Sequence, residues 1–257
     1  PLPAEGSGRG VTYLERRGRP MTAIVHDPAL REDPALAESV LAAVRFVVEK
    51  ERLHAEFEAT ARDAAALPTG FVTMLMTDME ASTAAYPRAL QTMLTNRYRT
   101  QTITMANEGN PGEFVSDGKV RLPATTGAAQ VLLLQEGAND MNQAHPPVDE
   151  IVADLRAMVQ LGRSRGMQVF VGTLLPQRMG ACRGYDFCDA VNDTVATNAK
   201  IRTMVTSEGV TLVELYTAFQ GRESTLLGLD GLHPNEAGYQ RMAELFFEAI
   251  RQKLEVP

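Results

Sequence analysis

Cysteine is scarce in this sequence. The two cysteines, Cys182 and Cys188, both lie in the segment ACRGYDFC. Two are too few for a disulfide framework, and neither has His or Cys companions at metal-ligand spacing, so we expect no metal site and no metal cofactor. The pair can remain as two reduced thiols or, if oxidised, can close a short loop worth about 2.4 kcal/mol by loop entropy.

Long apolar runs are also lacking. No stretch approaches the roughly 20 apolar residues that a bilayer-spanning helix needs, and no basic and apolar signal sequence opens the chain. We therefore expect no membrane partner and a cytoplasmic location.

Basic residues are also not in excess. The formal net charge is −7, from 25 Lys and Arg against 32 Asp and Glu. This charge repels phosphate backbones, and no stripe of Lys and Arg interleaved with aromatic residues is present to overcome the repulsion. The sequence therefore argues against nucleic acid as a partner.

The 257 residues, of which 44% are hydrophobic, suffice for one domain and a small extra element. Residues 1–66 are predicted to form that element, an N-terminal arm. Residues 1–20 carry little periodic signal, and MTAIVHD then predicts a short strand. Asp33 is a natural N-cap for a long helix that can continue to about Ala66. Such a helix suits a homodimer contact, but a helix docked on its own domain would show the same pattern.

From Phe71 onward, short apolar runs alternate with helical segments. The runs FVTMLM, TQTITMA, QVLLLQ, MQVFVGT and VTLVEL begin at Phe71, Thr100, Gln130, Met167 and Val210. The clearest helices run from about Val148 to Arg165, Asp189 to Glu208 and Asn235 to Leu254. Near-continuous apolar strands alternating with helices imply a parallel sheet covered on both faces. Residues 71–257 are therefore predicted to be one three-layer α/β/α domain with a five-stranded parallel sheet.

Polar segments that follow these strands are where we expect a site, because ligands bind beyond the carboxyl ends of parallel strands. After the third strand, Asn139 can point an amide donor at an oxygen that becomes negative during acyl transfer. Beyond the last strand, Asp230 precedes His233 by three residues in a turn, so the carboxylate can orient the ring as a general base. Each string alone also fits an ordinary cap or turn.

The loop after the second strand contributes a third candidate. It reads NEGNPGE, with two glycines and a proline beyond a strand end. The Gly112 backbone N–H can act as a second donor to the same developing negative charge. An ordinary tight loop is the alternative.

Three of these segments carry a family resemblance. Residues 86–257 resemble the SGNH (GDSL) hydrolase family: NEGNPGE is similar to its second block, QEGAND to its third and LDGLHPNEAGY to its fifth. The resemblance implies a flavodoxin-like fold that cleaves small-molecule carboxylic esters without a metal or other cofactor. It also implies that Gly112 and Asn139 form an oxyanion hole, and that Asp230 and His233 belong to a Ser-His-Asp triad.

The nucleophile of that triad is the point of departure from the family pattern. The family has a G-D-S string after its first strand, whereas MTDMEAST places Met79 at the position of the serine. The nearest downstream hydroxyls belong to Ser82 and Thr83, and Ser82 is our candidate nucleophile. The alternative is a catalytically silent module that binds or signals and has lost the family nucleophile.

Residues 1–83 carry a different resemblance. FVTMLMTDMEAST is similar to the opening strand of class III adenylate/guanylate cyclases, in which Asp78 would be a metal-binding residue. The preceding GRPMTAIVHDPALREDP and the long helix resemble a bacterial sensor region. No second metal-binding Asp or purine-binding segment of cyclase type follows, so cyclase activity is not expected.

Overall fold

The computed structural model describes part of the chain. The described residues are 10–16, 19–26, 40, 44, 48, 50, 67, 71–77, 85–178 and 190–255, of which 10–16, 19–26, 71–77 and 190–192 are described by their backbone alone. The chain divides into two compact units, Pro1–Ala61 and Arg62–Pro257.

The first unit contains a β-hairpin. Strand β1 (Gly10–Arg16) pairs antiparallel with β2 (Arg19–His26), with a register shift between Leu14 and Glu15. Strand β2 contains the predicted MTAIVHD strand except Asp27, which lies outside the described residues, and its partner β1 lies in the segment with little periodic signal. The expected long helix is described at residues 40, 44, 48 and 50, all helical, and its other residues lie outside the described part. The homodimer prediction therefore remains a prediction.

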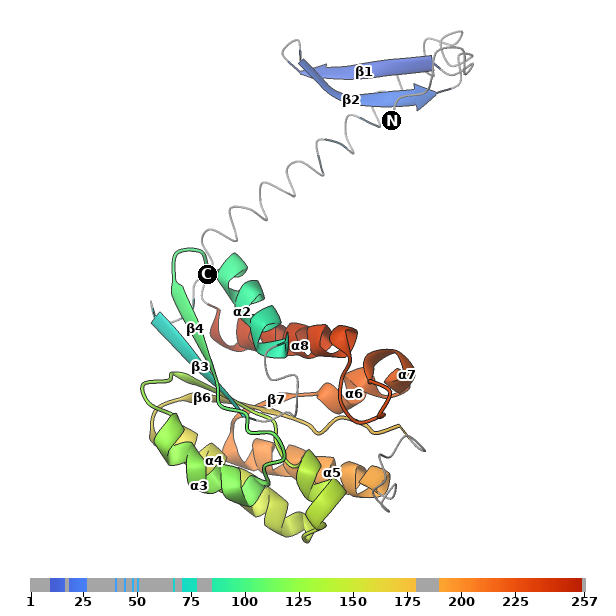
Figure 1. Ribbon diagram of the computed structural model, residues 1–257. Coiled ribbons are helices and arrows are strands. Elements are labelled where there is room, and N and C mark those ends of the chain that lie inside the picture. Colours follow the sequence, from blue (N-terminus) through green and yellow to red (C-terminus); the bar gives the residue numbers. More distant parts are fainter. Residues whose placement is uncertain are drawn as a thin grey trace. The chain divides into compact units, whose positions relative to one another are not determined.

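The second unit is built on a parallel sheet (Figure 1). Its strands are β3 (Phe71–Thr77), β4 (Thr102–Asn107), β5 (Val131–Leu134), β6 (Gln168–Gly172) and β7 (Thr211–Val213). They lie in the order β4-β3-β5-β6-β7, and every neighbouring pair is parallel. This order is that of a flavodoxin-like doubly wound sheet. The predicted parallel α/β architecture is confirmed.

Helices cover both faces of this sheet (Figure 1). Helices α2 (Ala85–Arg97) and α8 (Glu236–Leu254) pack on one face, and α3 (Val115–Thr125), α4 (Val148–Ser164) and α5 (Ala190–Glu208) pack on the other. Two short helices, α6 (Leu215–Phe219) and α7 (Glu223–Leu226), connect β7 to α8. Helices α4, α5 and α8 match the predicted ones to within one residue at each end.

Helices α2 and α3 were not predicted. Helix α2 has Pro87 in its first turn, and α3 contains both Gly118 and Pro123. Proline is tolerated in the first turn of a helix, but glycine and proline inside a helix weaken it, so local propensity speaks against α3. Burial overrides it, because Val115 and Leu122 of α3 are buried in the core.

Each face of the sheet carries its own apolar core. On the α8 face, Met242, Phe246 and Ile250 recur at helical spacing and are fully buried. The Phe246 ring lies 5.4 Å, centroid to centroid, from the ring of Tyr86 on α2. Alternate residues of β5 enter the two cores, Leu133 on the α8 side and Leu132 on the α4 side. The sheet is therefore fixed between two packed layers, and its strand ends provide a rigid base for loops.

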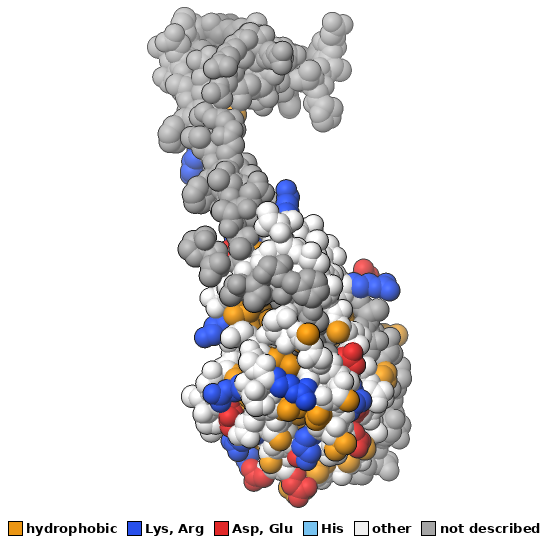
Figure 2. All heavy atoms as spheres, turned by 90° about the vertical axis from the view of Figure 1, so that its left-hand side faces the viewer, with side chains coloured by type: hydrophobic (Ala, Val, Ile, Leu, Met, Phe, Trp, Pro, Cys, Tyr) orange, Lys and Arg blue, Asp and Glu red, His pale blue; other side chains and the backbone are white. Residues whose placement is uncertain are grey.

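The surface of the second unit mixes side-chain types. On the face shown in Figure 2, acidic, basic and apolar side chains are interspersed and do not gather into one band. Among the described helices, none is both long and apolar enough to cross a bilayer.

Candidate active site

The predicted site residues follow the carboxyl ends of the strands. The Gly112 loop follows β4, Asn139 follows β5, and Asp230 and His233 lie between β7 and α8. In this strand order, the chain leaves β3 and β5 toward opposite faces of the sheet, and such a switch point is where doubly wound folds bind ligands. The fold therefore gathers these loops at one edge of the sheet.

Asp230 and His233 form a hydrogen-bonded pair. The Asp230 Oδ2 atom lies 2.8 Å from His233 Nδ1. The other carboxylate oxygen, Oδ1, accepts hydrogen bonds from the backbone N–H groups of Leu232 and His233, both at 3.1 Å. Because an ionised carboxylate can only accept, Nδ1 carries the proton and Nε2 is left as the basic nitrogen. This is the arrangement that a general-base histidine needs.

Asp230 is held in its ionised form. Burial of its side chain, which is 11% exposed, disfavours the charge. The hydrogen bonds from the His233 ring and from the two backbone N–H groups outweigh burial, so the pKa of Asp230 lies below its ordinary value of 3.8. The carboxylate therefore stays charged throughout the neutral pH range and can stabilise a protonated imidazole.

The turn that carries this pair is closed at its base by backbone bonds. Gly228 N–H donates to the His233 carbonyl at 2.7 Å, and Asn235 N–H donates to the Leu226 carbonyl at 2.9 Å. Asn235 also caps α8, because its side-chain oxygen accepts from Gly238 N–H at 3.0 Å. The position of His233 is therefore coupled to the start of a buried helix.

The Gly112 loop has the geometry of a type II β-turn. Glu113 N–H donates to the Asn110 carbonyl at 3.1 Å, Pro111 occupies the second position, and Gly112 has φ of +80° at the third. That position requires a positive φ, which explains the glycine. The turn uses the N–H of its fourth residue, so the Gly112 N–H is not used by the turn itself.

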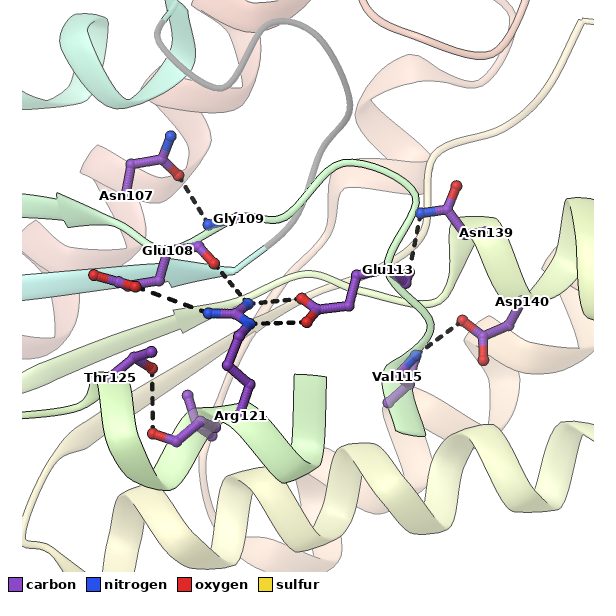
Figure 3. A network of polar contacts seen from close by, with 10 residues as sticks. Asn107, Glu108, Gly109, Glu113, Val115, Arg121, Thr125, Asn139 and Asp140 are labelled. Carbon is purple, nitrogen blue, oxygen red and sulfur yellow. Dashed lines mark hydrogen bonds and ion pairs between the residues drawn. The ribbon is translucent and has the colours of Figure 1, made fainter. Parts of the chain in front are cut away.

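Asn139 connects the loop after β5 to this turn. Its side-chain Nδ2 donates to the Glu113 carbonyl at 3.0 Å, and its Oδ1 accepts from Gln143 at 3.3 Å. The Asn139 side chain is buried. Figure 3 shows it beside the Glu113 carbonyl. A carboxamide has two N–H donors, and the bond to the Glu113 carbonyl uses one of them and fixes the orientation of the amide.

A charged cluster holds the same loop from the α3 side (Figure 3). Arg121 donates two hydrogen bonds to the buried carboxylate of Glu113, at 2.8 and 2.6 Å, and a third to the Glu108 carbonyl at 2.7 Å. Bidentate arginine-carboxylate pairs are strong and directional. The backbone from Glu108 to Glu113 is therefore held at both ends by one guanidinium.

Asp140 has a capping role. Its Oδ2 accepts from Val115 N–H, the first residue of α3, at 3.1 Å. Burial raises the pKa of this carboxyl, and the hydrogen bond from Val115 opposes that shift. The short helix that follows this segment (Asp140–Ala144) has no side-chain cap, so Asp140 caps an earlier helix and not the next one.

The structure brings the predicted residues together in two pairs. Asp230 contacts His233 directly, and Asn139 contacts the turn that contains Gly112 through the Glu113 carbonyl. Ser82 lies outside the described residues, as do Met79 and Asp78, so its place in a triad remains a prediction. Both cysteines also lie outside them.

Sequence reasoning missed Glu113 and Arg121. They are eight positions apart, with Glu113 ahead of α3 and Arg121 inside it, so no helical spacing connects them. Their pairing becomes visible only when the loop folds back over the helix. Within the described part of the chain, no three His, Cys, Asp or Glu side chains are grouped to hold a metal ion.

A cavity of about 750 Å³ lies between the starts of α2 and α8. Its lining includes Arg88 and Ala89 from α2 and Asn235, Glu236 and Tyr239 from the start of α8. Ligand sites commonly have volumes of roughly 300 to 1,000 Å³, so the space suits a small organic molecule. Asn235 follows His233 by two residues, but neither Asp230 nor His233 lines this cavity.

Comparison with solved structures identifies related folds. Axe2, an acetylxylan esterase from Geobacillus stearothermophilus, aligns with a TM-score of 0.62 and 18% sequence identity over 72% of this chain and 95% of that one. An α/β hydrolase from the metagenome of Lake Arreo, Spain, aligns with a TM-score of 0.60 and 18% identity over 74% and 97% of the two chains. A GDSL-like lipase from Bacteroides thetaiotaomicron aligns with 0.56 and 19% over 77% and 98%. At these identities the likeness concerns the fold.

Comparison at the level of sequence gives the family. A search of curated proteins found no match. The model of the GDSL-like lipase/acylhydrolase family matches residues 70–241. This range includes β3, the strand that resembled a cyclase opening strand, and β3 pairs with β4 and β5 in the same sheet. The cyclase and sensor resemblances of residues 1–83 gain no support from these comparisons. The chain belongs to the GDSL-like lipase/acylhydrolase family.

Proposed function

We propose that this protein hydrolyses small carboxylic esters by a Ser-His-Asp mechanism. The observation that carries the proposal is the 2.8 Å contact between Asp230 and His233 Nδ1, which leaves Nε2 of the ring as a base. The family match supports acyl hydrolysis as the reaction class.

The proposed reaction assigns one task to each residue. Ser82 Oγ attacks the ester carbonyl while His233 Nε2 takes its proton, and the ionised Asp230 stabilises the imidazolium. The Gly112 N–H and the second N–H of Asn139 donate to the oxyanion that forms. His233 then returns the proton to the departing alcohol, and a water molecule, deprotonated by the same ring, releases the acid from Ser82.

Asn139 supports this assignment through its orientation. Its amide is fixed by the Glu113 carbonyl on one side and by Gln143 on the other. A donor that is oriented before the substrate arrives needs no reorganisation as charge develops, which is why such donors contribute strongly to catalysis. The Arg121–Glu113 pair holds the loop that makes this contact.

Ser82 is proposed as the nucleophile because it is the first hydroxyl after the Met79 position and lies within the family match. It precedes α2 by three residues, and α2 packs on α8, whose start carries the His233 turn. Acetylxylan esterases occur among the similar structures, which favours an acetyl or other short acyl group as the group transferred.

Turnover of p-nitrophenyl acetate tests the proposal. The full chain should hydrolyse it in the presence of a chelator, Ser82→Ala should lose the activity, and Thr83→Ala, its immediate neighbour, should retain it. Full activity in Ser82→Ala would exclude this nucleophile. No turnover by the unaltered protein would favour the silent binding module, and gain of activity in Met79→Ser would then indicate that the first loop keeps the family geometry.

A further inference from the structure

Arg178 bonds to both neighbours of Asp230 along the chain. Its backbone N–H donates to the Gly231 carbonyl at 2.8 Å. Its guanidinium Nη2 donates to the Leu229 carbonyl, also at 2.8 Å. The two carbonyls that flank Asp230 are thus bound by one residue from a different part of the fold.

The base and the tip of the Asp230 turn are held differently. The base is closed by bonds within the segment from Leu226 to Asn235. At the tip, residues 229–231, Leu229 is 96% exposed, Asp230 is partly buried and Gly231 is buried. One bond within the turn reaches the tip, from Gly231 N–H to the Gly228 carbonyl at 3.0 Å. The exposed Leu229 side chain has no apolar packing to fix it, so the contacts from Arg178 supply positional restraint from outside the turn.

Arg178 can supply that restraint because its own segment is anchored. Residues 173–178 leave the carboxyl end of β6, and Thr173 N–H continues the sheet by donating to the Val213 carbonyl at 3.0 Å. At Leu174, both the N–H and the carbonyl bond to the side-chain amide of Asn198 on α5, at 2.8 and 2.9 Å. Asn198 is fully buried, so this anchor is rigid.

We propose that Arg178 is a positioning residue that sets the orientation of the Asp230 carboxylate toward His233. The inference rests on the proposed ester hydrolysis and adds a residue to it. Arg178 acts through the backbone on each side of Asp230, and Asp230 acts on the imidazole. Without the Arg178 guanidinium, the backbone bond from Arg178 to the Gly231 carbonyl remains, but the Leu229 carbonyl is no longer held. The Asp230 carboxylate then samples orientations in which it no longer contacts His233 Nδ1.

The chain offers a matched control. Arg165 also donates one side-chain hydrogen bond to a distant backbone carbonyl, that of Pro123, at 2.9 Å on the surface. It follows α4, and its segment does not contact the Asp230 turn. Arg165→Ala therefore removes the same kind of bond without touching the candidate site, whereas Arg178→Lys keeps one donor near the Leu229 carbonyl.

The first measurement is steady-state kinetics with p-nitrophenyl acetate. Arg178→Ala should lower kcat roughly 10- to 100-fold, because a misplacement of about 1 Å costs up to ~100-fold, with KM changed by less than about twofold. Arg178→Lys should recover part of kcat, and Arg165→Ala should match the unaltered protein. If Arg178→Ala keeps full kcat, or changes kcat only to the extent that Arg165→Ala does, the proposal is wrong.

The second measurement does not need turnover. A proton shared between His233 Nδ1 and a carboxylate gives a low-field signal in the proton NMR spectrum, assigned by its loss in His233→Ala. That signal should broaden or vanish in Arg178→Ala and persist in Arg165→Ala and Arg178→Lys. Its persistence in Arg178→Ala would overturn the positioning role. A protein without esterase activity that shows the predicted NMR changes would contradict the proposed function and leave the positioning role supported.

Discussion

Replacement of Asp230 by Asn should leave the turn in place and invert the protonation of His233. Asn is the same size, and its side-chain oxygen can keep the two bonds that Oδ1 accepts from the backbone N–H groups of Leu232 and His233. Its NH₂ group then faces Nδ1 at the position now held by Oδ2. Because NH₂ is a donor, Nδ1 must become the acceptor and the proton moves to Nε2. The ring then presents an N–H where a base is needed.

The size of the loss follows from what the base contributes. General acid–base catalysis is worth roughly 10²- to 10⁴-fold, and a wrong tautomer combined with a lost carboxylate charge lies at the upper end of that range. We expect kcat/KM to fall roughly 10³- to 10⁴-fold, which corresponds to about 4 to 5.5 kcal/mol in the activation barrier. The free energy of unfolding should fall by only about 1 kcal/mol, or roughly 2 to 4 °C in Tm, because the two backbone bonds survive and the third is replaced by a bond between neutral groups.

The assay is hydrolysis of p-nitrophenyl acetate at pH 7 to 8, with Tm measured on the same samples. Asp149→Asn is the matched control, since the Asp149 side chain is 81% exposed and contacts Lys200 on the surface, away from the turn. Asp149→Asn should keep full activity. A decrease in kcat/KM of less than about tenfold in Asp230→Asn would refute the reasoning, because a ring with its proton on Nε2 cannot act as the base.

Three further predictions concern other parts of the structure. Asn139→Asp keeps the shape and removes both amide donors, so kcat should fall roughly 10²- to 10³-fold, and unchanged kinetics would remove Asn139 from the oxyanion hole. Gly238→Ala should destabilise the fold by roughly 1 to 3 kcal/mol in urea unfolding, because the added Cβ would clash with the Leu226 carbonyl, and a neutral result would contradict that packing. Glu255→Gln tests the hydrogen bonds from Arg97 that hold the pKa of Glu255 below its ordinary value of 4.5. The ionised Glu255 stabilises the fold above pH 4.5, and this stabilisation disappears as the pH falls through the lower pKa of the folded state. Glu255→Gln should therefore lower the free energy of unfolding by roughly 1 to 3 kcal/mol at pH 7 and by less below pH 4. A decrease that does not depend on pH would contradict the assignment.

The sheet was predictable because its signal is local. The central strands β5 and β6 are short apolar runs between polar segments, and burial on both faces leaves such a run no polar side. The Asp230–His233 pair was predictable for a similar reason, since three residues in a turn suffice to bring a carboxylate to a ring. Both predictions depend on residues that are close in sequence.

The features that the sequence did not predict depend on residues that are distant in the chain. Helix α3 forms in spite of Pro123, because its start is capped by Asp140, 25 positions from the Val115 N–H that it binds. Arg178 and the Leu229 carbonyl are 51 positions apart. No periodicity connects such pairs, so only the folded chain reveals them. Strand β1 is a different case, because GVTYLER has no regular alternation and its strand depends on pairing with β2.

The central claim is that His233 activates Ser82 for attack on an ester carbonyl. Reaction of the full chain with a fluorophosphonate ester, followed by mass spectrometry of its peptides, tests this claim most directly, because the reagent bonds to a serine whose proton a neighbouring base removes. The account predicts one phosphonyl group on Ser82, with no labelling in His233→Ala. A label on another residue, or none on a chain that still hydrolyses p-nitrophenyl acetate, would contradict it.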